Sequence, residues 1–491
     1  MDRKRKKKIQ NARVVMTNIF MGISVIAIVF VLMLVAMGYG FNEQGGIEQS
    51  GLIQISSNPK GASVEIDNET QFSRTDFNKM LSSGEHRVKI GKSGYDTWEK
   101  TIKVDAGLLT RIEWARLFPV KVETTNVANY NNLRLAEFSS NRKHLLTIEH
   151  DSPIILYSDI QGEKINVHKL SLNQALGNNE NVLEGEISIR AWNENGNKVL
   201  ATWRHDDKTT WHILDLENIE KSINLNEKFG LEFSDIRILN DSASKLWALE
   251  KNNIHIIDSS SHTISGVLIS NVEQFTNNKD VIAYVGIDVK DHNYRKIRIY
   301  KEGEEGSTDI LDLKDKKPNI TLAMGSYWNE SWLGYSLDNQ ITVFGGTYPS
   351  FDKPSKNSLK EYVKRELPFT PTIASTNQLG RIVAFAGSSN VTTIDIETRN
   401  YFDSVTEAES SKLNWLDSYI FWENNDNKII IRDFDGDNRR EILTVNNQQP
   451  INITENNRWL YYFEIKEAET DKETNATKSE TIYTLKRQKL E

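Results

Sequence analysis

The distribution of apolar residues along the chain first predicts a single membrane-crossing helix. Residues 14–42 contain no charged side chain, and residues 19–37 are almost wholly apolar. About 20 such residues, at 1.5 Å each, are long enough to cross the ~30 Å hydrocarbon core of a bilayer. A helix in a soluble core would keep a polar face, which this stretch lacks. We therefore predict a transmembrane helix over residues 14–38.

The charges that flank this span predict its orientation. Residues 1–13 carry seven Lys or Arg and one Asp, whereas acidic residues follow the span. The positive-inside tendency then places residues 1–13 in the cytoplasm and the bulk of the chain outside, which predicts a single-pass protein of the plasma membrane. A cleaved signal peptide is the alternative, but its apolar core would be shorter and would end in an A-x-A-like site, which Ala36-Met37-Gly38 matches poorly.

A second pattern, of short alternating runs, begins after a Gly- and Gln-rich linker at residues 39–50. Between residues 51 and 118, apolar residues alternate with polar ones in runs separated by turn residues, which predicts two hairpins and a closing strand. The segment resembles the PEGA domain, a small β-sandwich module of bacterial surface proteins. The matching residues are Pro59, Gly61, Ala62, Gly84, His86, Val88, Gly94 and Tyr95.

Two departures from the PEGA pattern stand out. Lys60 occupies an acidic position, and the Thr-Pro turn expected near Thr75-Asp76 is missing. We expect the sandwich fold to tolerate both changes. The resemblance implies an envelope-associated scaffold and no particular chemistry.

A third pattern recurs through residues 119–491. A polar turn is followed by two apolar strands, in units that begin near residues 138, 192, 238, 275, 327, 374, 414 and 452. Their average spacing of about 45 residues is typical of four-stranded propeller blades. Eight units favour eight blades, with seven as the alternative, and residues 119–127 are expected to help close the ring. The units resemble WD40-like and TolB-type repeats, so we predict an all-β ectodomain, a small sandwich plus a propeller, behind one N-terminal transmembrane helix.

Tryptophan is frequent in the repeats and is interpreted mainly as core. Trp192, Trp328, Trp415 and Trp459 lie at the start of a unit or inside its strand, where residues pack between blades, whereas Trp332 and Trp422 are less clearly placed. Residues 348–371 read as an insertion between units, with a basic helix-like stretch at residues 358–365. We interpret it as a passive connection that could also make contacts.

One acidic stretch has two interpretations. Asp433, Asp435, Asp437 and Glu441 have the spacing of a calcium loop, in which carboxylate oxygens wrap a hard cation. The same residues fit a polar turn between two strands of the seventh unit. The turn is favoured because the pattern occurs once, so no metal or other cofactor is assigned and calcium remains the alternative.

The remaining features bear on function. The chain has no Cys, which excludes disulfides, thiolate metal sites and a cysteine nucleophile. With a net charge of −8 and a basic N-terminus, the rest of the chain is acidic, which argues against binding nucleic acid. No catalytic motif is present, and the nine His are scattered; His205, next to Asp206 and Asp207, comes closest to a cluster. We therefore expect a non-catalytic scaffold that binds envelope polymer or another envelope protein, with binding residues unidentified. A hydrolase or lyase with a site in the propeller funnel is the alternative.

Overall fold

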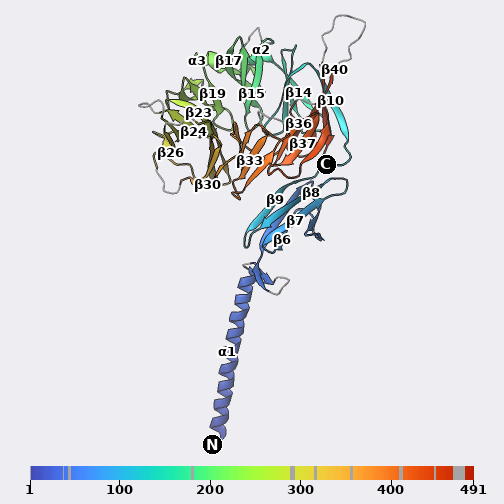
Figure 1. Cartoon of the computed structure of the whole chain (residues 1–491), viewed down its shortest axis with the longest axis vertical. Coiled ribbons are helices and arrows are strands. Elements are labelled where there is room, and N and C mark those ends of the chain that lie inside the picture. The colour runs from blue at the N-terminus through green and yellow to red at the C-terminus, as the bar shows by residue number, and fades with distance from the viewer. Residues whose placement is uncertain are drawn as a thin grey trace. The chain divides into compact units, whose positions relative to one another are not determined.

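The computed structural model describes residues 2–36, 38–41, 46–177, 182–287, 294–314, 318–353, 358–407, 413–446, 449–467 and 481–491. They separate into two compact units, Met1–Lys121 and Val122–Glu491. The first unit holds a long helix and a small β-sandwich, and the second is a β-propeller (Figure 1). The predicted all-β fold, a small sandwich plus a propeller behind one N-terminal apolar helix, is confirmed.

Helix α1 (Asp2–Ala36) contains the apolar stretch expected from the sequence. Residues Arg13–Val35 form a 23-residue segment with a mean hydropathy of 2.7 and none of it buried against protein. At 1.5 Å per residue this segment is about 35 Å long, which exceeds the thickness of a bilayer's hydrocarbon core. Among the residues that the structure describes, α1 is the one helix long and apolar enough to cross a membrane.

The expected linker at residues 39–50 is partly strand. β1 (Tyr39–Phe41) and β2 (Ile47–Gln49) pair in an antiparallel hairpin. Its tip, residues 42–45, lies outside the described residues. The Gly and Gln composition predicts a flexible linker. The backbone N–H and C=O groups of its two ends nevertheless pair with each other, which composition alone does not indicate.

Two sheets form the sandwich. The first consists of β6 (Phe77–Leu81), β3 (Gly51–Asn58) and β9 (Leu109–Arg116), and the second of β5 (Glu69–Thr70), β4 (Ser63–Ile66), β7 (Gly84–Gly91) and β8 (Thr97–Val104). Buried and partly exposed residues alternate along β3, as the sequence pattern predicts for a strand with one face in a core. Ile53, Ile55, Val88, Ile90 and Trp98 are fully buried between the sheets.

The second unit contains eight four-stranded antiparallel sheets in its described residues, so the favoured prediction of eight blades is confirmed over seven. The first four blades consist of β11 (Leu133–Phe138), β12 (His144–Glu149), β13 (Ile154–Asp159) and β14 (Asn166–Ser171); β15 (Glu186–Trp192), β16 (Lys198–His205), β17 (Lys208–Asp215) and β18 (Ile223–Asn224); β19 (Asp235–Ile238), β20 (Lys245–Glu250), β21 (Asn253–Asp258) and β22 (Thr263–Ile264); and β23 (Val272–Asn278), β24 (Val281–Ile287), β25 (Arg295–Lys301) and β26 (Thr308–Lys314).

The next three blades follow the same order. They consist of β27 (Ile320–Tyr327), β28 (Glu330–Leu337), β29 (Gln340–Gly346) and β30 (Lys360–Glu366); β31 (Ile373–Thr376), β32 (Ile382–Gly387), β33 (Asn390–Asp395) and β34 (Tyr401–Val405); and β35 (Asn414–Trp415), β36 (Ile420–Asn425), β37 (Lys428–Asp433) and β38 (Arg440–Thr444). Short helices α2 (Leu172–Ala175), η1 (Ile219–Lys221) and α3 (Leu225–Phe229) lie in connections of blades 1 and 2.

Strands from both ends of the unit form the eighth blade. β39 (Asn452–Ile453), β40 (Trp459–Glu467) and β41 (Thr481–Lys489) are joined by β10 (Thr124–Asn131), which pairs antiparallel with β41. Figure 1 shows β10 beside the C-terminal strands. The ring is therefore closed by a strand near the predicted residues 119–127, displaced by a few residues.

The core of the propeller lies between neighbouring blades. Leu146 and Ile148 of blade 1, for example, pack in one cluster with Val199 and Trp203 of blade 2. Trp192, Trp203, Trp211, Trp332 and Trp459 are buried, as are most large apolar strand residues. One prediction is wrong: Trp328, expected in the core, is 76% exposed. It lies just past the end of β27, in the turn and outside the strand.

The helix-like reading of residues 358–365 is also wrong. Most of this stretch belongs to β30, the fourth strand of blade 5, which pairs with β29. The fourth strand is the last in each sheet, where one edge is unpaired and charged side chains are favoured over apolar ones. Residues 354–357 of the supposed insertion lie outside the described residues.

Candidate functional site

The face of the propeller that carries the site is defined by its turns. Because successive strands of a blade run antiparallel, the turn between strands one and two (the first turn) and the turn between strands three and four (the third turn) lie on one face of the ring. We call this the turn face.

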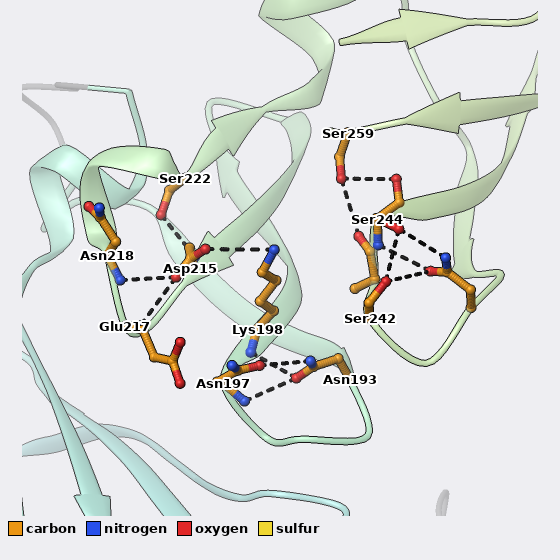
Figure 2. A network of polar contacts seen from close by, with 12 residues as sticks. Asn193, Asn197, Lys198, Asp215, Glu217, Asn218, Ser222, Ser242, Ser244 and Ser259 are labelled. Atoms are coloured by element: carbon orange, nitrogen blue, oxygen red, sulfur yellow. Dashed lines mark hydrogen bonds and ion pairs between the residues drawn. The ribbon is translucent and has the colours of Figure 1, made fainter. Parts of the chain in front are cut away.

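Several first turns share one hydrogen-bonding arrangement. Figure 2 shows Asn193, whose Oδ1 accepts hydrogen bonds from the backbone N–H groups of Asn197 and Lys198 at 3.0 and 2.8 Å. Asn240 and Asn377 accept in the same way from the last residue of the turn and the first residue of the second strand of their blades. Asn suits this position because its short side chain reaches the neighbouring backbone.

The third turn of blade 2, between its third and fourth strands, is held in a similar way by an Asp at the end of the third strand. The Oδ1 atom of Asp215 accepts from the backbone N–H groups of Glu217 and Asn218 at 3.2 and 2.9 Å (Figure 2). Lys198 Nζ lies 3.7 Å from Asp215 Oδ2 and so connects the first and third turns of blade 2. The turn face is thus fixed by side-chain to backbone bonds.

Hydrogen bonds also join the turns of successive blades. Trp332 Nε1 donates to the Gly380 carbonyl at 2.7 Å, which ties blade 5 to blade 6, and Asn377 Nδ2 donates to the Ser418 carbonyl at 2.6 Å, which ties blade 6 to blade 7. Trp247 donates to the Lys279 carbonyl at 3.0 Å between blades 3 and 4. These bonds hold the turns at fixed spacing, so a binding surface built from them is pre-organised.

A hollow of about 820 Å³ opens on the turn face between blades 4, 5 and 6. We call it the outer hollow. Its polar lining is mostly neutral hydroxyl and amide groups, among them Asn278, Ser326, Ser331, Thr347, Ser350 and Gln378.

The charges of the outer hollow lie at one edge. Lys279, Asp280 and Lys301 line it from blade 4, and Asp280 is the one carboxylate among the described lining residues. Lys301 Nζ is 3.9 Å from Asp280, and Lys279 Nζ is 3.4 Å from Asp241. These pairs partly neutralise the edge, which leaves a lining suited to neutral, hydrogen-bonding ligands.

Three exposed, large apolar residues lie in the hollow or within a few residues of its lining. Leu379, which lines it, is exposed, and so is Phe351, the residue after the lining residue Ser350. Trp328 lies in the two-residue turn between Tyr327 and Glu330, next to the lining residues of β27 and β28. Exposed apolar groups gathered beside a hollow are typical of binding surfaces.

The backbone at Trp328 is strained. Its φ is +53°, whereas most of the other non-glycine residues with positive φ are Asn or Asp. A bulky residue in this conformation costs on the order of 1–3 kcal/mol. The two-residue hairpin turn requires a positive φ at this position, which is usually met by Gly, Asn or Asp; the choice of a Trp there, with an exposed indole, is unusual and is typical of a functional position.

Tyr348, a lining residue of the outer hollow, holds several of its strands together through hydrogen bonds. Its hydroxyl lies 2.8 Å from the Gly325 carbonyl oxygen and 2.9 Å from that of Trp332, and it accepts a 3.3 Å bond from the Asn278 amide. Burial raises the pKa of Tyr348, so this hydroxyl keeps its proton throughout the physiological range. Tyr348 therefore joins blades 4 and 5 as a neutral hydrogen-bonding group.

A buried ion pair supports the blade 5 turn from the side of blade 6. Arg381 is almost fully buried and binds Asp395 through two hydrogen bonds, Nε to Oδ1 at 3.0 Å and Nη2 to Oδ2 at 2.8 Å. Burial alone would lower the pKa of Arg381, but the hydrogen bonds and charge of Asp395 raise it overall. The guanidinium lies 5.7 Å from the Tyr327 ring, and that ring meets the Trp328 indole edge-on at 6.2 Å.

A second hollow, of about 380 Å³, adjoins the first. We call it the inner hollow: it shares Thr376 and Gln378 with the outer one and is lined by residues of blades 1, 6, 7 and 8. Glu137, Arg142 and Asp417 are among its lining residues. Asp417 Oδ1 accepts the backbone N–H groups of Tyr419 and Ile420 at 2.8 and 2.9 Å, so this carboxylate helps to form its own turn.

The acidic stretch at residues 433–441 connects β37 to β38, where the turn interpretation places it. Asn438 Nδ2 donates to Asp433 Oδ2 at 2.9 Å, and the Asp437 N–H donates to Asp435 Oδ1 at 3.2 Å. Glu441 instead lies on β38, with Lys428 Nζ 3.1 Å away. Among the described residues no three His, Asp or Glu side chains are gathered as a metal site, and the calcium hypothesis stays a prediction.

The His205 group lies elsewhere. His205 ends β16 and Asp206 and Asp207 form the second turn of blade 2, so all three lie on the face opposite the turn face. Its ring stacks on Trp203 at 5.4 Å, and Nε2 is 3.3 Å from Asp206. The structure thus does not bring His205 near either hollow.

Trp328 and the lining of the outer hollow were not assigned from the sequence as binding residues. A signal for Trp328 was available: the strands "LAMGSY" and "ESWLGY" leave "WN" as a two-residue turn, where a large aromatic residue is unusual. The hollow itself depends on turns that are about 50 residues apart in sequence, and no local pattern indicates that they meet.

Comparison with known proteins identifies one segment of the chain. Residues 50–115 match the PEGA domain family. This segment is a PEGA domain. No curated protein has a sequence that matches the chain.

The chain is also similar to several solved structures, one of which is described as a β-propeller domain. The β-propeller domain of Cps50 (Swd1) from Myceliophteria thermophila is 13% identical, with 66% of this chain and 100% of that one covered and a TM-score of 0.39. A prolyl endopeptidase is 10% identical, with 70% and 53% covered and a TM-score of 0.45. An oligogalacturonate lyase in complex with manganese is 10% identical, with 76% and 98% covered and a TM-score of 0.40. At these identities and TM-scores the likenesses carry no inference about function.

In the PEGA domain, the two departures from the family pattern meet. Lys60 Nζ lies 2.9 Å from Asp76 Oδ2, and the hydrogen bond to Asp76 raises the pKa of Lys60. Thr75, next to Asp76, is buried, and its hydroxyl lies 2.6 Å from that of Ser57 and accepts the Ala62 N–H at 3.0 Å. The sandwich therefore tolerates both departures, as expected, because the changed residues form a contact with each other.

Proposed function

We propose that this protein is a membrane-anchored, extracytoplasmic binding protein of a bacterial cell envelope, and that its propeller holds an envelope glycan. Helix α1 is the anchor in this proposal, with the basic residues 1–13 in the cytoplasm. The PEGA domain and the propeller fold are both consistent with a scaffold or binding role outside the membrane.

The observation that carries the proposal is the outer hollow with its mostly neutral polar lining, together with the exposed Trp328 in the adjoining β27–β28 turn. Sugars present hydroxyl groups, which pair with Ser, Thr, Asn and Gln side chains, and apolar C–H faces, which pack on indole rings. Both kinds of group occur here, in turns that are pre-organised by side-chain to backbone bonds. A pre-organised site loses less conformational entropy when it binds its ligand.

The direct test is binding of the full-length protein, in detergent or nanodiscs, to purified envelope glycan. We expect retention of the wild type and at least a tenfold weaker Kd for Trp328→Ala, measured by isothermal titration calorimetry. Tyr401→Ala, which removes an exposed aromatic residue from β34, is the control and should bind like the wild type. Failure of the wild type to bind glycan, or equal affinities for Trp328→Ala and the wild type, would overturn the proposal. Capture of one defined envelope protein through the same hollow would replace the glycan by a protein partner.

The inner hollow favours a second candidate, an extracytoplasmic hydrolase or lyase, because Glu137, Arg142 and Asp417 line it. Against it, Asp417 already accepts two backbone hydrogen bonds. Incubating the protein with the same glycans and measuring released fragments decides between the two. Cleavage that disappears in Glu137→Gln would establish an enzyme.

A further inference from the structure

The base of the PEGA domain is connected to the end of helix α1 by a short chain of backbone hydrogen bonds. The Gly38 N–H donates to the Val35 carbonyl at 3.0 Å, and the Ser50 N–H donates to the Gly38 carbonyl at 2.8 Å. The Gly107 N–H then donates to the Ser50 carbonyl at 3.0 Å. The β8–β9 turn contains Gly107 and Leu108. Only Ser50 and Gly38 therefore stand between this turn and the last turn of the apolar helix in the chain of hydrogen bonds.

Apolar side chains gather at this base. Leu52 of β3 pairs with Met80 of β6 on one side and with Leu109 of β9 on the other, so the three form one row across the outer face of the sheet. Met80 is 47% exposed and Leu109 44%, and Leu108 in the adjoining turn is 60% exposed. We call Leu52, Met80, Leu108 and Leu109 the basal patch.

The row above the basal patch is different. One pleat further from the helix, the same three strands present Asn78, Gln54 and Arg111. The outer face of this sheet thus changes from apolar to polar within a single row, which is about 7 Å along a strand. A surface that lies across a membrane–water boundary needs this arrangement, because its lower row meets lipid and its upper row meets headgroups and water.

Met80 also lies close to the helix end. A Cβ atom on Gly38 would be 3.2 Å from Met80 Cε. The basal patch therefore continues the apolar surface of α1 beyond the end of the apolar segment at Val35. The patch lies at the end of the apolar helix, and the next row of the same face is polar. A membrane surface is therefore the partner that fits it.

We propose that the basal patch docks the PEGA domain onto the outer surface of the membrane that α1 crosses, with Leu108, Leu109 and Met80 in the lipid interface. The proposal rests on α1 being a membrane anchor, which is part of the proposed function. The PEGA domain is then a membrane-seated base, and its anchoring has two parts: a spanning helix and an interfacial apolar patch.

The test uses the absence of Cys from the chain, which allows a fluorophore to be attached at one site at a time. Leu108→Cys and Met80→Cys, each labelled with an environment-sensitive dye, are reconstituted as full-length protein in phosphatidylethanolamine/phosphatidylglycerol vesicles that contain nitroxide lipids. Phe72→Cys is the matched control, because Phe72 is a fully exposed apolar residue of the same domain outside the patch. We expect quenching at residues 108 and 80 to be at least twice that at residue 72.

A label at Ile28→Cys, within the apolar segment, separates the two parts of the proposal. Strong quenching at residue 28, with residues 108 and 80 quenched no more than residue 72, would overturn membrane docking and leave the anchor intact. No quenching at residue 28 would overturn the anchor and the docking together. In the docked protein, adding L108D and L109D should reduce quenching at residue 80 to the level of residue 72, and unchanged quenching would overturn the role of the patch.

Discussion

At the scale of single residues, the buried Arg381–Asp395 pair is an arrangement that is costly to disturb. Both side chains are almost fully buried, and Glu397 Oε2 lies 2.9 Å from the third guanidinium nitrogen. A buried charge that loses its partner retains its desolvation cost. Arg381 also lies against the Tyr327 ring, which contacts Trp328. Loss of the ion pair is therefore expected to affect the position of Trp328 as well as the stability of the propeller.

Asp395→Asn should lower the free energy of unfolding by about 3–5 kcal/mol, because it removes the main charge partner of Arg381. Urea unfolding of the protein measures this. The comparison is Glu186→Gln, which breaks an exposed pair with Arg204 and should cost less than about 1 kcal/mol. Equal costs for the two variants would contradict the assignment of the buried pair.

His212 predicts how stability depends on pH. The ring is fully buried, and burial lowers its pKa from 6.5 to about 4 in the folded chain. As the pH falls through 6.5 the unfolded chain therefore takes up a proton that the folded chain does not. The stability contributed by neutral His212 is complete above pH 6.5 and is lost between pH 6.5 and 4, by about 3 kcal/mol in total.

His212→Gln should remove this dependence. We expect the difference in unfolding free energy between wild type and variant to shrink by about 2–3 kcal/mol when measured at pH 4.5 in place of pH 7.5. A difference that stays constant would show that His212 is protonated in the folded chain at the lower pH.

The sequence identifies most core tryptophans but not their exceptions. Trp192, at the start of a unit, and Trp459, inside a unit's strand, are buried as predicted, whereas Trp328, also at the start of a unit, is exposed. The difference is a shift of one position, since Trp328 is the first residue after β27 and not its last. Strand ends are set by pairing with the next strand, which a pattern along one segment does not show.

At the scale of elements, close contact between turns decides which glycines are required. Gly380 has a φ of +70°, and a Cβ atom on it would overlap the Ser326 carbonyl oxygen of blade 5. Gly303 has a similar φ of +87° but no atom within 4 Å of its would-be Cβ. Comparing the two glycines therefore distinguishes the effect of the left-handed backbone, which both share, from the effect of close packing, which only Gly380 has.

Gly380→Ala should therefore cost clearly more stability than Gly303→Ala. The second variant carries only the left-handed backbone strain, about 1–2 kcal/mol, whereas the first must also push blades 5 and 6 apart. Thermal unfolding compares their stabilities, and glycan binding should weaken only in Gly380→Ala because Gly380 lines the outer hollow. Similar losses of stability in both variants would argue against a tight contact between the blades.

Elements could be predicted where apolar periodicity is strong. The repeat spacing indicates eight blades, and each unit contains strands that the structure confirms. Outer strands are the weak point: in β30 only Val363 is buried, and the charged residues around it suggested a helix. The hollows could not be predicted at all, because they depend on the angles between blades.

At the scale of the whole molecule, the basic tail and apolar helix predict a definite topology. A protease added to the outside of intact spheroplasts should degrade the propeller and leave an epitope tag before residue 1 protected. Tag and propeller are followed by immunoblotting. A mature protein that has lost the N-terminal tag would indicate a cleaved signal peptide in place of the anchor.

The closure of the ring has a consequence for export. β10 and β41 pair with each other, and the adjoining Thr481 N–H donates to Asn132 Oδ1 across 349 residues of chain. A chain that leaves the ribosome N-terminus first exposes β10 long before its partner has been synthesised. If α1 is an N-in anchor, β10 must wait outside the cell while the other blades follow it through the translocation channel. The eighth blade can therefore form only after the whole chain has crossed the membrane. A chain halted before β41 would expose the unpaired edges of β10 and β40 to the proteases and chaperones of the envelope.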